Sequence, residues 1–148
     1  MERFRWHLSA AIKEREAFAK VRQEVHDEIA AGGQAFSERQ LQLTDWQQRD
    51  FVPALTGLFF SCSAMVAMRR MNFMSKSHRL MIILPALPFY IIPYQIVYHA
   101  KEAEYLVEMM REDKSAKFAK RLRSKFEVAS KGLDSAVLDE LEAGAEIE

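Results

Sequence analysis

The chain has 148 residues, with 21 basic and 21 acidic side chains and a mean hydropathy of −0.20. This length is enough for one domain and no more, and the zero formal net charge points to no class of partner. The single cysteine, Cys62, excludes a disulfide framework and a zinc site built from paired thiols.

Residues 1–50 predict an N-terminal amphipathic helical arm. Apolar residues recur at spacings of three and four over 3–31, which predicts one helix, and Gly32-Gly33 is expected to end it in a left-handed cap. Ser37 with Gln40 matches a capping box at the start of the next helix, and Thr44 with Gln47 repeats that spacing. The first fifteen residues partly resemble a basic amphipathic presequence. They lack the apolar core and the cleavage site of a secretory signal, which argues against one. Because the chain begins at Met1, we expect any targeting signal here to be retained.

Two runs without charge, 51–68 and 80–98, interrupt the charged chain. Eighteen helical residues extend about 27 Å, close to the ~30 Å hydrocarbon core of a bilayer. The runs therefore predict two transmembrane helices, over about 51–71 and 79–99, with Asp50 capping the first. The alternative is two buried helices of a soluble bundle. The predicted hairpin covers 51–99, with a basic connector over 69–79.

Small side chains form a stripe along the first predicted span, at Ala54, Gly57, Ser61 and Ala64. In lipid, such a stripe lets two helix backbones approach closely. We expect it to pack against the second span or against a helix of another protein.

Three prolines, Pro85, Pro88 and Pro93, lie inside the second predicted span. Each removes a backbone donor, so the carbonyls of Met81, Leu84 and Phe89 lose their helical partners. Ser61 and Ser63 on the first span are candidate donors. We expect a kinked span that fits against other subunits; the alternative is a gating hinge, although neither span contains the charged residue typical of a transport path.

Residues 100–148 predict a second charged helical arm with an acidic tail. Leu106, Met110, Phe118, Leu122 and Phe126 keep to one face, so the second span is expected to continue as helix for some thirty residues, followed by a short helix capped by Asp134. Each arm has a single apolar stripe. The arms therefore need a membrane surface, each other or other chains.

Basic residues flank both predicted spans. We expect Arg69, Arg70, Lys76, Arg79 and Lys101 to contact lipid headgroups. The connector favours placement on the matrix or cytoplasmic side, whereas the basic residues after the second span argue for the reverse. The basic run 114–125 adjoins acidic residues and a span, which favours anionic lipid, such as cardiolipin, over nucleic acid.

No residues form a convincing cofactor or metal site, and we predict no cofactor. His78 and His99 lie about 31 Å apart on a helix, too far to bind one haem iron. The methionines at 65, 68, 71 and 74 drift around a helix, so their sulfurs do not converge on copper. Tyr90, Tyr94, Tyr98 and Tyr105 match an interfacial belt better than a quinone site.

The whole chain resembles the small accessory subunits of energy-transducing complexes in the mitochondrial inner membrane. The resemblance lies in the basic amphipathic start, the two spans and the charged arms, and it implies an all-α, non-catalytic structural subunit of a respiratory-chain complex. An accessory subunit of ATP synthase is an alternative within this class. Two alternatives lie outside this class. One is a stand-alone lipid-binding or assembly factor, and the other is a small oligomeric channel or metal carrier.

Overall fold

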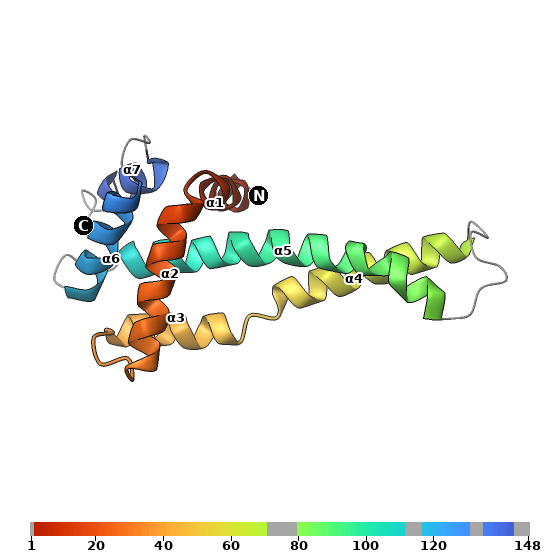
Figure 1. The fold of residues 1–148 in the computed structure, drawn as a ribbon, viewed down its shortest axis with the longest axis horizontal. Coiled ribbons are helices and arrows are strands. Elements are labelled where there is room, and N and C mark those ends of the chain that lie inside the picture. The colour runs from red at the N-terminus through yellow and green to blue at the C-terminus, as the bar shows by residue number, and fades with distance from the viewer. Residues whose placement is uncertain (1, 71–79, 112–116, 131–134, 144–148) are drawn as a thin grey trace. The chain divides into compact units, whose positions relative to one another are not determined.

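The computed structural model describes residues 2–70, 80–111, 117–130 and 135–143, with only the backbone described at 46 and 80–84. Over these ranges the chain forms seven helices and no strands, which confirms the all-α class (Figure 1). The helices are α1 (Glu2–Lys13), α2 (Arg15–Ala30), α3 (Glu38–Gln48), α4 (Val52–Arg70), α5 (Leu80–Arg111), α6 (Lys117–Ala129) and α7 (Ala136–Ala143).

The chain divides into two compact units. Unit 1 comprises Met1–Arg49 together with Ala100–Glu148, and unit 2 comprises Asp50–His99. Both predicted arms therefore belong to the same unit, although fifty residues of unit 2 separate them in the sequence.

Unit 1 has an apolar core built by both arms. Phe18 of α2 packs edge-on against Phe126 of α6, with ring centroids 5.2 Å apart, and Phe36 packs against Phe118 at 4.9 Å. Leu106, Met109 and Met110 of α5 are buried in the same core. Of the three ways in which the arms could cover their apolar stripes, the described residues show the arms packing against each other.

In the N-terminal arm the predicted glycine cap is confirmed, but the predicted single helix is not. Gly32 and Gly33 have positive φ angles of 96° and 67°, which confirms the glycine cap. The expected single helix over 3–31 is wrong, because the chain breaks at Glu14, whose buried side chain bonds to Ser135 on another segment.

The capping predictions for α3 and α4 have mixed outcomes. Ser37 and Gln40 form the reciprocal capping box at the start of α3, with bonds of 3.1 and 3.2 Å. Thr44 instead lies inside α3, where its hydroxyl bonds to the Gln40 carbonyl, so the second predicted box is wrong. Asp50 accepts a 2.9 Å hydrogen bond from the N–H of Val52 and thus caps α4 as predicted.

The C-terminal arm does not continue as one straight helix. α5 ends at Arg111, and in α6 the Arg123 guanidinium donates to the carbonyl of Met110, thirteen residues back. Thirteen residues of straight helix would separate these groups by about 20 Å, so α5 and α6 are not parts of one straight helix. Asp134, the predicted cap, lies outside the described residues; Ser135 caps α7 by accepting a 3.2 Å bond from the N–H of Leu138.

Candidate functional site

Unit 2 has its large apolar side chains outside and its small ones inside. On α4, Phe59 is 69% exposed and Leu55 is 63% exposed, whereas Gly57 and Pro53 are buried. α5 repeats this arrangement, because Ala86 is buried while Ile92 and Phe89 are exposed. A domain surrounded by water normally buries large apolar groups, as unit 1 does. The exposed apolar side chains of unit 2 therefore form a candidate surface for contact with an apolar environment.

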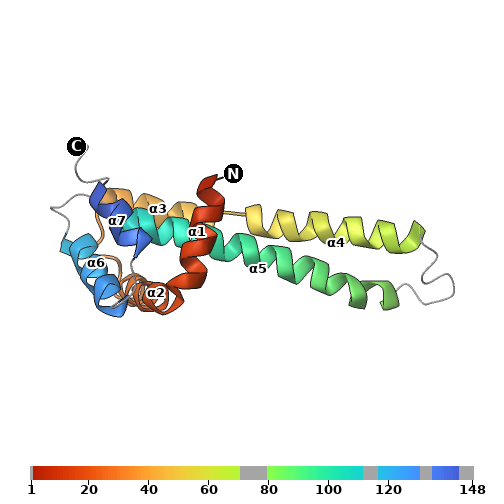
Figure 2. The same ribbon diagram turned by 90° about the horizontal axis from the view of Figure 1, so that it is seen from above.

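The helices α4 and α5 run side by side in unit 2, in both views (Figures 1 and 2). The predicted small-residue stripe lies on their contact side, where Gly57 is buried and Ala54, Ser61 and Ala64 are partly buried. A Cβ atom placed on Gly57 would lie 2.9 Å from two ring carbons of Tyr90 and 3.0 Å from its carbonyl oxygen. Only glycine allows this approach.

The three prolines all lie within α5, which remains helical around them. Ser61 Oγ is 3.5 Å from the carbonyl oxygen of Ala86 on α5, at the long limit of a hydrogen bond. Ser63 donates to the carbonyl of Phe59 in its own helix. The two serines thus do not bond to the carbonyls that the prolines leave without partners.

Among the described residues, α4 is the one helix that is long and apolar enough to cross a membrane. The second uncharged run begins at residues 80–84, of which only the backbone is described, so the two-span prediction is not confirmed.

The tyrosines of α5 divide between the two units. Tyr90, Tyr94 and Tyr98 stack on one side of the helix, with ring centroids 5.8 and 5.9 Å apart. Tyr105 is buried in unit 1, with its hydroxyl 3.2 Å from that of Thr44, and burial raises its pKa. The predicted interfacial belt is therefore wrong for Tyr105.

The residues predicted to contact headgroups have different surroundings. Arg69 and Arg70 are exposed at the end of α4, and Lys76 and Arg79 lie outside the described residues. Lys101 forms an ion pair of 2.8 Å with Glu104 in unit 1.

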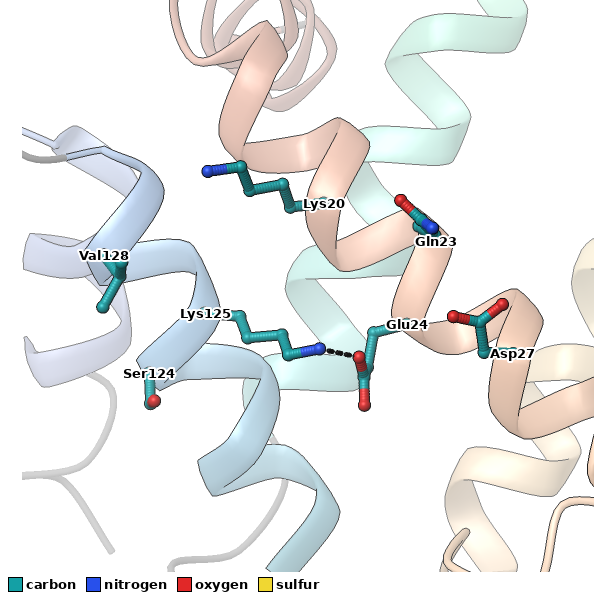
Figure 3. A pocket seen from close by; sticks show the side chains of 7 residues that line it. All are labelled: Lys20, Gln23, Glu24, Asp27, Ser124, Lys125 and Val128. Carbon is teal, nitrogen blue, oxygen red and sulfur yellow. Dashed lines mark hydrogen bonds and ion pairs between the residues drawn. The ribbon is translucent and has the colours of Figure 1, made fainter.

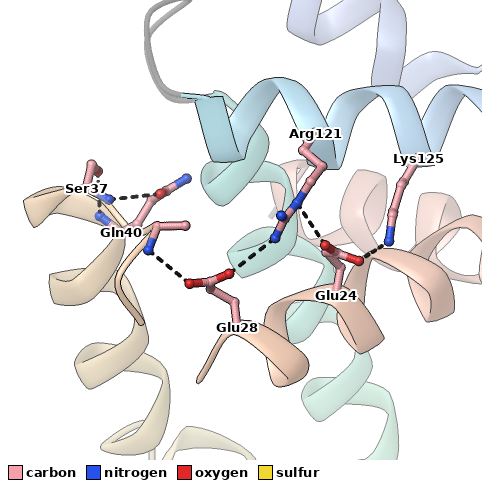
Figure 4. A network of polar contacts seen from close by, with 7 residues as sticks. Glu24, Glu28, Ser37, Gln40, Arg121 and Lys125 are labelled. Carbon is pink, nitrogen blue, oxygen red and sulfur yellow. Dashed lines mark hydrogen bonds and ion pairs between the residues drawn. The ribbon is translucent and has the colours of Figure 1, made fainter. Parts of the chain in front are cut away.

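Much of the basic run 114–125 is engaged within unit 1 (Figure 4). Arg121 bonds to Glu24 at 2.8 Å and to Glu28 at 3.2 Å, and Lys125 also pairs with Glu24. These α6 side chains serve the contact with α2, which the alternation of charges in sequence did not indicate because the partners lie about a hundred residues away.

A shallow pocket of about 340 Å³ lies beside the same contact (Figure 3). Its lining is Lys20, Gln23, Glu24, Asp27, Ser124, Lys125 and Val128. Two basic and two acidic side chains balance each other, and Lys125 is paired with Glu24. The pocket lacks the apolar, concave lining typical of a small-molecule site.

The interior of unit 1 contains polar groups that sequence reasoning missed. Gln40 is fully buried and donates to the Met109 carbonyl at 3.1 Å, and Arg22 bonds to Glu102 at 2.6 Å. Of these polar groups, Glu14 could have been recognised as buried from the sequence, because it lies on the apolar stripe, four residues from both Ala10 and Phe18.

Glu14 and the partly buried His7 have shifted pKa values. Burial raises the pKa of Glu14, against the opposing effect of its hydrogen bonds to Ser135 and Val137. Burial lowers the pKa of His7, against the opposing charges of Glu104, Glu140 and Glu108. The His7 Nδ1 atom is buried without a hydrogen-bond partner among the described residues.

The described part of the chain brings no three His, Cys, Asp or Glu side chains together as metal ligands. Cys62 is exposed on α4, and His78, Met71 and Met74 lie outside the described residues. No protein family model, curated protein or solved structure matches the chain.

Proposed function

We propose that this chain is a non-catalytic accessory membrane subunit, in which α4 and residues 80–99 of α5 cross the bilayer as a hairpin and unit 1 folds outside it. The exposure of Phe59 beside the buried Gly57 is the observation that carries this proposal. Packing through small residues with bulky residues outside is the usual arrangement of helices in lipid.

The proposed setting is a large respiratory-chain complex of the mitochondrial inner membrane, with an ATP synthase complex as the alternative. The basic amphipathic start and the spans without charge support this setting. The prolines support a protein environment for the hairpin, because a neighbouring subunit can supply donors to backbone carbonyls that lipid cannot.

A stand-alone lipid-binding or assembly factor is the second candidate. It is favoured by the core of unit 1, in which Phe18 of one arm packs against Phe126 of the other. In that case the hairpin is an anchor surrounded by lipid alone.

A photoactivatable amino acid at Phe59 separates the two candidates. In native membranes, a subunit should crosslink to another protein at position 59 and migrate with a very large assembly on a native gel in mild detergent. A matched label at Lys120, exposed on α6, controls for random collision. Crosslinks to lipid alone, with a small monodisperse particle, would overturn the subunit proposal in favour of the anchor.

A further inference from the structure

Several cations of unit 1 pair with a carboxylate, among them Arg22, Arg39, Arg111 and Arg121. Others are exposed, such as Lys117 and Lys120 of α6. In the described part of the chain, no ion pair holds Arg3, Arg5 or Lys13 of α1, all of which are exposed. Glu2 is the one acidic residue of this helix, so α1 carries excess positive charge.

The same helix leaves an apolar strip uncovered. Phe4, Leu8 and Ile12 are spaced by four and so share one face of α1. Ile12 is 70% exposed and Phe4 37% exposed, while Leu8 is partly buried. The buried side of α1 is elsewhere, at Ala10, with Trp6 and Ala11 packed against the core.

We propose that this face of α1 lies on the surface of an anionic bilayer, with Phe4, Leu8 and Ile12 at the boundary of the acyl chains and Arg5 and the flanking Lys13 on the lipid phosphates. A helix with an exposed apolar strip beside unpaired cations has the chemistry of interfacial helices. The proposal rests on the proposed function in that the hairpin brings a membrane to the protein. It assigns lipid contact to α1 and not to α6, because the apolar residues Phe118, Leu122 and Phe126 of α6 are buried in the core of unit 1.

The test uses the full chain with Cys62→Ser, reconstituted in vesicles of neutral phosphatidylcholine or of phosphatidylcholine with added cardiolipin. A polarity-sensitive fluorophore is attached at Ile12→Cys or, as the matched control, at Lys120→Cys on exposed α6. We expect a blue shift at position 12 in the anionic vesicles, its reversal by high salt, and its loss with Arg5→Glu and Lys13→Glu. Position 120 should emit alike in both vesicles.

Equal emission from position 12 in neutral and anionic vesicles would overturn the proposal. A shift in native membranes that is absent from the anionic vesicles would also overturn it, and would assign the face to an acidic protein surface. A separate sample, which keeps Cys62 and carries the label only there, keeps the two proposals distinct. If iodide quenches this label in vesicles, hairpin insertion is wrong, while the signal at position 12 still reports on α1.

Discussion

The carboxylate of Glu14 accepts a 2.8 Å hydrogen bond from the hydroxyl of Ser135, a residue 121 positions away in the chain. Glu14 lies at the break between α1 and α2, and Ser135 lies directly before α7. The Ser135 hydroxyl also accepts the N–H of Leu138. One buried carboxylate thus fixes the first turn of α7 to the opposite end of the sequence.

Replacing Glu14 with glutamine should flatten the dependence of stability on pH. Because burial raises the pKa of Glu14 above 4.5, the folded chain binds this proton more tightly than the unfolded chain. The stability that this group contributes is present below pH 4.5 and is lost as the pH rises through the folded-state pKa. Unfolding curves of the full chain in micelles, measured by circular dichroism, should show Glu14→Gln losing less stability over that window. Glu16→Gln, at an exposed neighbour, should retain the slope; equal slopes for the Glu14 variant and the parent chain would contradict the prediction.

Replacing His7 should have the opposite effect on pH dependence. Burial lowers the pKa of His7 from 6.5, so the unfolded chain binds the proton more tightly. The contribution of this group is present above pH 6.5 and is lost as the pH falls through the folded-state pKa. Between pH 6.5 and 5, the free energy of unfolding of His7→Gln should therefore fall less than that of the parent chain, measured by circular dichroism in micelles. His26→Gln, at an exposed histidine of α2, is the control, and a matching gain there would argue against a specific role for His7.

Gly57→Ala should loosen the pairing of α4 with α5. The added methyl group would lie 2.9 Å from the Tyr90 ring and 3.0 Å from the Tyr90 carbonyl oxygen, and a carbonyl in a helix cannot rotate away. We expect a loss of about 1–3 kcal/mol, which is typical of overpacking. Ala67→Val, on the exposed side of α4, should cost little. Adding Tyr90→Ala to Gly57→Ala should restore only part of the loss, since the carbonyl remains; full restoration would show that the ring alone limits the approach.

Glu24→Gln should weaken the contact of α2 with α6. The Glu24 side chain is only 13% exposed and serves both Arg121 and Lys125. We expect a loss of about 1–2 kcal/mol in the free energy of unfolding, because two cations lose a partly buried acceptor. Asp45→Asn removes the exposed pair with Arg49 and should change stability by less than about 0.5 kcal/mol. Similar losses for the two variants would mean that the network contributes no more than a surface pair.

Local signals in the sequence predicted the helical class and several helix ends. The glycines at 32 and 33, the box of Ser37 with Gln40 and the role of Asp50 all depend on neighbours within a few residues. Such interactions are visible in a sequence because backbone conformation and capping are local.

The packing of unit 1 could not be predicted in the same way. Lys125 and Glu24 are 101 residues apart, and nothing in the spacing of charges identifies such a pair. The break at Glu14 has the same origin, because a periodic stripe predicts a straight helix unless a distant partner such as Ser135 draws a side chain inward. The exposure of the α4 side chains was consistent with the uncharged run. The fit of Gly57 against Tyr90 could not be predicted, because it depends on how two helices pack.

Both ends of the chain belong to unit 1, so the core of this unit can form only late in the synthesis of the chain. Ribosomal synthesis delivers α1, α2 and α3 first, then the whole apolar segment, and only afterwards the α6 residues that complete the core around Phe18. Phe59 and its exposed neighbours therefore emerge before unit 1 can fold. At that stage their apolar side chains must be kept from water by a chaperone or a bilayer. Nascent chains halted before α6 should depend on chaperones or on a bilayer, and removing α6 and α7 should leave the N-terminal helices open to proteolysis.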